Sequence, residues 1–172
     1  MVSCRYISKL IDVIPYDVLV MSWGVLGLCT MIVIVLKGVK IGLHYSLRFL
    51  LLEYLFLITS STVLFRKTKI GRKFEFTPCW SYDHPNLIAE IIMNIAVFIP
   101  VGILLGLCFA RWPWWKIVGA GCLFSVMIET LQLIFRKGFC EFDDVFHNTL
   151  GCVIGYGLYL ITSLLVRRFR LY

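Results

Sequence analysis

The chain has 172 residues, of which 60% are hydrophobic and 16% charged, and its mean hydropathy is +0.88. Soluble domains are closer to 45–50% apolar and about 25% charged, so this composition excludes a soluble nucleotide-binding enzyme, a secreted disulfide-bonded domain and a disordered chain. The formal net charge of +7 indicates loops at anionic lipid headgroups, and we expect membrane lipids and no nucleic acid as partners.

Apolar segments long enough to cross a bilayer recur along the chain. A helix needs about 20 residues for this, and five segments qualify: 14–36, 47–65, 88–110, 115–135 and 145–166. Only helices satisfy the backbone in lipid at such lengths. The predicted fold is therefore all-α, a polytopic membrane bundle of about five transmembrane helices.

We predict three parts in the chain: an extra transmembrane helix with a basic loop (1–46), the main helical bundle (47–166) and a basic tail (167–172). The second segment carries Arg48 and Glu53, which we expect to form a structural pair or to snorkel toward the headgroups.

The acidic residues are distributed unevenly between the two faces of the predicted bundle. Nine of the ten fall at or nearest the face that would hold the N-terminus, and the Lys and Arg residues divide almost equally. The opposite face therefore carries the whole net charge of +7, which favours a cytoplasmic position for it, with the N-terminus outside and the C-terminus inside.

Polar side chains enter three predicted helices at one end of the bundle, where the ends of an up-down bundle meet. Ionisable groups inside a membrane cost roughly 2.5–3.5 kcal/mol each, so they tend to be paired or functional. The candidate ligand-binding residues are Glu90, Asn94, Glu129, Gln132, Arg136, Asp143, Asp144 and Asn148. Among them, Glu129, Asp143 and Asp144 are also the candidate catalytic residues.

Structural roles compete with these assignments. Glu90, Asp143 and Asp144 lie where a carboxylate caps a helix N-terminus. Asn94 and Gln132 are of a type that forms interhelical hydrogen bonds.

The remaining polar residues have structural readings as well. Glu129 is near a helix C-terminus, where a salt bridge to Arg136 or Arg66 would stabilise it. The spacing also pairs Asp143 with His147, and Asp144 with Asn148, along one helix; otherwise we expect His147 to be solvated at the interface.

Two Gly-x-x-x-Gly sequences, Gly102 to Gly106 and Gly151 to Gly155, lie on helices that also carry the polar residues. Small residues at this spacing let helices approach closely in membranes. Pro100 should kink the third helix one turn after Asn94.

Taken together, these motifs resemble the VanZ-like family of bacterial membrane proteins over about residues 74–160. The matching residues are Asn94, Phe98, Pro100, Gly102, Glu129, Gln132, Asp143, Asp144, Asn148, Gly151 and Gly155, preceded by the proline-aromatic loop 76–82. Glu141 departs from the pattern, since many relatives have Asp at that place. The resemblance implies that the Asp-Asp loop lies outside, and an association with low-level resistance to teicoplanin; it implies no established chemistry.

Three functions remain open. The first is an envelope protein of the bacterial cytoplasmic membrane that engages lipid-linked cell-wall precursors or a lipoglycopeptide at the outer leaflet. The second is an intramembrane enzyme acting on a polyprenyl-phosphate or phospholipid headgroup, with oxygen ligands for a divalent cation. The third is a small transporter or flippase subunit. We predict no cofactor other than the divalent cation that the second function allows. Whether the chain is an enzyme or forms a homo-oligomer is left open.

Overall fold

Four transmembrane-length helices make up most of the part of the chain that the structure describes. The computed structural model describes Val25, Leu28, Ile32, Val35 and residues 39–64, 74–75, 88–138 and 140–169. The helices long and apolar enough to cross a membrane are Leu43–Leu64, Ile88–Cys108, Trp114–Ile134 and Phe142–Val166. The predicted all-α fold is thus confirmed. Most of the predicted segment 14–36 lies outside the described residues, although its four described residues are helical.

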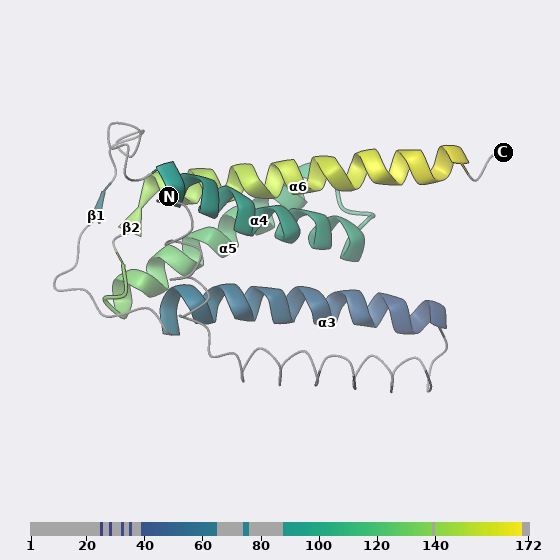
Figure 1. Ribbon diagram of the computed structural model, residues 1–172, viewed down its shortest axis with the longest axis horizontal. Helices are drawn as coiled ribbons and strands as arrows, with labels where there is room; N and C mark the ends of the chain where they lie inside the picture. Colours follow the sequence, from purple (N-terminus) through teal and green to yellow (C-terminus); the bar gives the residue numbers. More distant parts are fainter. Residues whose placement is uncertain are drawn as a thin grey trace, which may run out of the picture. The chain divides into compact units, whose positions relative to one another are not determined.

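The chain divides into two compact units, Met1–Thr68 and Lys69–Tyr172. In the first, helix α3 (Val39–Thr59) continues into the π-helical turn η1 (Ser60–Leu64), as Figure 1 shows. Hydroxyls of the four residues Thr59–Thr62 donate to carbonyls three or four residues earlier, at 2.7–2.9 Å. Each of these hydroxyls therefore has its hydrogen-bond acceptor within its own helix and needs no partner from another segment.

Glu53 lies near the middle of α3 and does not form the predicted pair with Arg48. Both of its carboxylate oxygens are shielded from solvent and have no hydrogen-bond partner among the described residues. Arg48 is exposed. Residues five apart lie about 140° apart around a helix, so the two side chains leave α3 in different directions.

The described part of the second unit contains three long helices and a short pair of strands. They are β1 (Phe74–Glu75), α4 (Ile88–Cys108), α5 (Trp114–Ile134), β2 (Cys140–Glu141) and α6 (Phe142–Phe169). The strands pair in parallel, with Phe74 opposite Cys140. Helix α4 continues through Pro100 to Cys108. The helix is therefore not broken at Pro100, and the kink stays a prediction.

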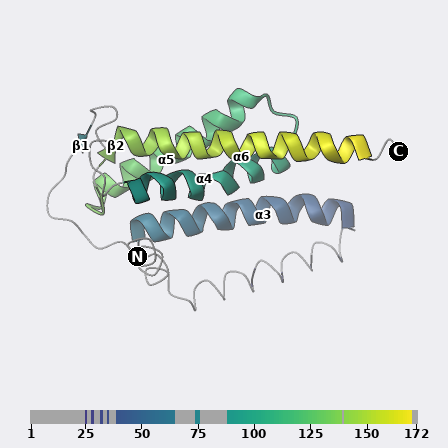
Figure 2. The same cartoon turned by 45° about the horizontal axis from the view of Figure 1, so that its top comes forward.

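Helices α4 and α6 run side by side in the same direction (Figures 1 and 2). Their backbones meet at glycines: a Cβ added at Gly151 would meet the carbonyl of Ile95, and one at Gly155 the carbonyl of Ile99. On the facing helix, a Cβ at Gly102 would meet the carbonyl of Cys152. Such close approach is what small residues permit in membranes, where van der Waals packing rather than hydrophobicity drives helix association.

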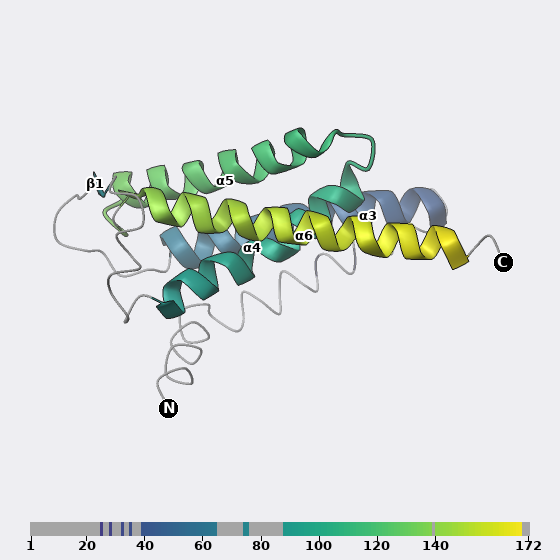
Figure 3. The same cartoon turned by 90° about the horizontal axis from the view of Figure 1, so that it is seen from above.

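Helix α5 runs in the opposite direction and packs on α6 (Figure 3). Gly121 makes room for the side chain of Cys152, whose thiol lies 3.9 Å from the carbonyl oxygen of Ile117. The rings of Phe98 and Phe124, 5.9 Å between centroids, join α5 to α4. The second unit is thus a three-helix bundle with α6 in contact with both partners.

The C-terminus of α5 ends in a Schellman motif whose left-handed position is occupied by Arg136. The Lys137 amide donates to the Gln132 carbonyl at 2.8 Å, and the Arg136 amide donates to the Leu133 carbonyl at 3.3 Å. Arg136 has φ 55°, a conformation that favours glycine. A non-glycine residue is therefore held there at a backbone cost of roughly 1–2 kcal/mol.

The glycine contacts generate a testable prediction. We expect Gly155→Val to lower the thermal stability of the purified protein strongly, because the new side chain collides with the backbone of α4; core overpacking alone costs typically 1–3 kcal/mol. Gly157→Ala is the matched control, since a Cβ there meets nothing within 4 Å. Thermal unfolding in detergent, followed by size-exclusion chromatography, measures both variants. Equal stability of the two would contradict the contact.

Candidate functional site at the polar end of the bundle

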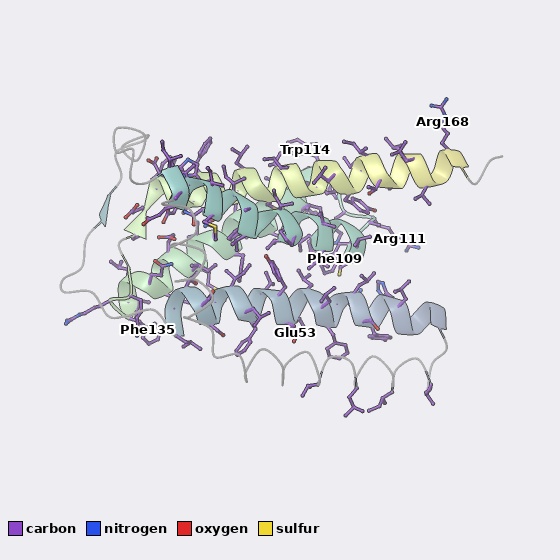
Figure 4. All side chains as sticks on the ribbon, viewed as in Figure 1. Glu53, Phe109, Arg111, Trp114, Phe135 and Arg168 are labelled. Carbon is purple, nitrogen blue, oxygen red and sulfur yellow. The ribbon has the colours of Figure 1, made fainter. Side chains whose placement is uncertain are left out.

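Polar side chains gather at the end of the bundle where α4 and α6 begin and α5 ends. We call this region, residues 88–94, 125–148 and the β1–β2 pair, the polar end. The opposite end holds the turn between α4 and α5. Figure 4 labels Phe135 at the polar end and Arg111 at the opposite one.

A hydrogen bond between Asn94 and Asp144 joins α4 to α6. The Asn94 side-chain amide donates to an Asp144 carboxylate oxygen at 2.7 Å. Asn94 lies six residues into α4, about 9 Å from its first residue along the axis. The predicted bond between Asp144 and Asn148 is therefore replaced, for Asp144, by an interhelical one.

Glu129 joins α5 to the strand that precedes α6. Its side chain is 2% exposed, and Oε2 lies 3.4 Å from the backbone amide of Glu141, which donates to it. The predicted salt bridge to Arg136 does not form, because Arg136 is exposed and its side chain makes no ion pair with any described residue. The alternative partner, Arg66, lies outside the described residues. The left-handed backbone at Arg136 turns the chain out of the helix here.

A second layer of polar residues lies deeper between α5 and α6. The Asn148 amide donates to the Ser125 hydroxyl at 2.8 Å, and both residues are buried. His147 is 0% exposed, with its ring 5.6 Å from that of Phe146. The expectation of a solvated His147 is wrong, because this residue belongs to the stripe by which α6 packs on its neighbours, together with Asp143 and Gly151.

The remaining candidates divide between the interior and the surface. Gln132 and Asp143 are buried at 4% and 3% exposure, as an interior site requires. Glu90 and Arg136 are exposed, so the structure does not bring them into the buried cluster. Six of the eight predicted residues are thus buried or half-buried at the polar end, and two are exposed on its rim.

Sequence reasoning missed Ser125 and the burial of His147. Ser125 precedes Glu129 by four residues and so continues the polar face of α5 by one turn. Ser125 could have been predicted by following the polar face of α5 from Glu129 one turn further into the helix. The burial of His147 depends on the rotation of α6, for which the sequence offers only the glycine spacing.

Negative charge dominates the described residues at this end of the unit. Residues 88–94 and 129–144 contain five carboxylates and two cations, Arg136 and Lys137. Burial raises the pKa of the Cys140 thiol above its ordinary value, and the nearby negative charges of Glu129, Glu141 and Asp144 raise it further. Among the described residues, no three His, Cys, Asp or Glu side chains group closely enough to hold a metal ion.

The Asn94–Asp144 bond predicts an energetic coupling between α4 and α6. In a double-mutant cycle of Asn94→Ala and Asp144→Ala, we expect a coupling energy of about 0.6–1.7 kcal/mol, the range of interhelical hydrogen bonds in membranes. Unfolding in mixed micelles with increasing denaturing detergent provides the measurement. Glu90→Ala, one turn earlier on the same helix and exposed, is the matched control. Additive effects of the Asn94 and Asp144 changes would contradict the contact.

The raised pKa of Cys140 predicts a pH profile for its alkylation. In a variant whose other six cysteines are replaced, the rate should reach its midpoint above the pH typical of a free thiol, because only the thiolate reacts. Glu129→Gln removes a negative charge and should lower the pKa, so that alkylation at a given pH below the midpoint becomes faster. Glu90→Gln should leave the pH dependence of Cys140 alkylation unchanged. An unchanged profile in the Glu129 variant would place the carboxylate away from the thiol.

Comparisons with known proteins identify the family to which the chain belongs. The chain is 34% identical over 92 residues to Protein VanZ of Enterococcus faecium, an alignment covering 54% of this chain and 55% of that protein, so the match spans about half the length of the relative. No solved structure matches the chain. The family model described as VanZ/LLP1 matches residues 25–165. With most of its length matched, the chain belongs to the VanZ/LLP1 family and is a VanZ-like multi-pass membrane protein.

Proposed function

We propose that this protein lowers the susceptibility of a bacterial cell to teicoplanin-like lipoglycopeptides by engaging polar groups of lipid-linked envelope material at the polar end of its bundle. The observation that carries the proposal is the arrangement of Asn94, Asp144 and Glu129. One hydrogen bond joins Asn94 of α4 to Asp144 of α6, and another joins Glu129 of α5 to the backbone of the strand that precedes α6. The three side chains lie within about two turns of the helix ends at the polar end.

The chemistry of the polar end supports a ligand rich in hydrogen-bonding groups. Carboxylates accept hydrogen bonds, while the amides of Gln132 and Asn148 both donate and accept. Peptide, amine and hydroxyl groups of cell-wall precursors and glycopeptides offer the complementary donors and acceptors. Arg136, on the rim, adds a planar guanidinium suited to phosphate, and its strained backbone conformation is of a kind that clusters at functional sites.

The proposal includes the orientation of the protein in the bacterial cytoplasmic membrane. The polar end would lie at the outer leaflet, with the N-terminus outside and the C-terminus in the cytoplasm. The distribution of acidic residues in the second unit supports this. Every carboxylate in its described part lies at the polar end, so that Arg111, Lys116 and Arg168 give the opposite end a net positive charge.

Expression in a teicoplanin-susceptible host tests the proposal. The wild-type chain should raise the minimum inhibitory concentration of teicoplanin more than that of vancomycin. Glu129→Ala and Asn94→Ala should return it to the empty-vector value, since each removes a hydrogen-bonding side chain of the polar end. Glu90→Gln, exposed at the same end, should keep the wild-type effect.

Two further measurements interpret the result. Immunoblots of membrane fractions establish that each variant accumulates to the same level. In intact cells, an impermeant thiol reagent should label Arg136→Cys in a chain without other cysteines. Unchanged susceptibility with the wild-type protein present would overturn the proposed function, and labelling only after lysis would reverse the orientation.

A further inference from the structure

The end of the bundle opposite the polar end exposes an unusual number of aromatic side chains. Trp112, Trp114 and Trp115, three of the five tryptophans in the chain, are 40%, 65% and 57% exposed. They lie at the turn between α4 and α5, where Phe109 and Trp112 stack with 4.4 Å between ring centroids. Tryptophan rings with an apolar body and one polar N–H are most stable at the level of lipid headgroups.

The same turn carries positive charge without acidic neighbours. Arg111 and Lys116 flank the tryptophans and are exposed. The Lys116 ammonium lies 5.2 Å from the centre of the Trp115 ring, so the ring faces the cation. The sequence has no acidic residue between Glu90 and Glu129, and both of these belong to the polar end. Within the described residues, neither cation forms an ion pair.

Helix α6 delivers further charge to this end. Because α4 and α6 run parallel, the last turns of α6 lie toward the end that holds the turn, and Figure 4 labels Arg168 and Arg111 there. Arg168 is exposed, and Ile161 and Leu164, which precede it, are exposed and apolar. Along this segment the apolar side chains come first and the arginine last. A lipid leaflet has the same order, with acyl chains inside and phosphates at the surface.

We infer that this basic, tryptophan-rich end is a binding surface for anionic phospholipid headgroups. The cations of Arg111, Lys116 and Arg168 would meet the lipid phosphates, and the three tryptophan rings would lie at the headgroup level beside them. Charge complementarity indicates an anionic lipid, since zwitterionic headgroups would leave the positive charge uncompensated. The inference does not depend on the function proposed for the polar end.

The test uses the full-length protein in phosphatidylcholine nanodiscs that contain either brominated phosphatidylglycerol or brominated phosphatidylcholine at the same mole fraction. Bromine quenches tryptophan at short range, so wild-type fluorescence should be quenched more by the phosphatidylglycerol. Added salt should reduce this preference without changing quenching by phosphatidylcholine, because it screens exposed charges.

The double variant Arg111→Gln/Lys116→Gln should lose most of the preference, with local enrichment falling about five-fold for each cation removed. Arg136→Gln/Lys137→Gln, which removes two cations at the polar end, should keep it. Equal quenching by the two lipids in the wild-type protein would overturn the inference. So would full retention of the preference in the Arg111/Lys116 variant. If that variant fails to assemble, the salt dependence in the wild-type protein decides the question.

Discussion

Direct contact between the backbones of α4 and α6 is the constraint on which the second unit depends. In lipid the acyl chains are as apolar as leucine, so helices gain little by burying apolar side chains against one another, and close packing must supply the attraction. The glycines of both helices remove the side chains that would hold the axes apart. Their positions also fix the axial register of the pair, and this register brings Asn94 within reach of Asp144.

The hydrogen bonds at the polar end depend on that register. Once α4 and α6 are held together, α5 packs on α6 with its own polar face, and the hydroxyl of Ser125 meets the amide of Asn148. Each of these bonds joins two different helices. Such bonds satisfy groups whose burial in lipid is costly, and they also specify the rotation of each helix. The same atoms therefore serve packing and define the candidate site.

Much of this could be predicted from the sequence, because length and hydropathy alone determine transmembrane segments. Helices α4, α5 and α6 begin and end within three residues of their predicted bounds. The convergence of Asn94, Glu129 and Asp144 also follows from an up-down arrangement in which three helix ends meet. The particular partners could not be predicted. Spacing along one helix suggested Asp144 with Asn148, whereas the structure pairs each with another helix, since the angle and register between helices are not encoded in the period of either one.

Some errors had a more local cause. The salt bridge expected from Glu129 to Arg136 does not form, because the chain leaves the helix through a left-handed backbone conformation at Arg136 and the Arg136 side chain is exposed. The pair expected between Arg48 and Glu53 neglected the rotation of five residues around a helix axis. His147 was placed at the interface by its distance from the end of the segment, although the direction in which it points determines its burial.

The parallel course of α4 and α6 has a consequence for biosynthesis. Two adjacent helices joined by a short turn, such as α4 and α5, can enter the membrane as a hairpin while the ribosome is still extending the chain. Asp144 follows Asn94 by 50 residues. Until α6 has been translated and inserted, Asn94 therefore lacks this acceptor and the glycines of α4 lack their counterpart. The polar end therefore cannot assemble before α6 enters the membrane, and a nascent chain acquires the candidate site only after that step.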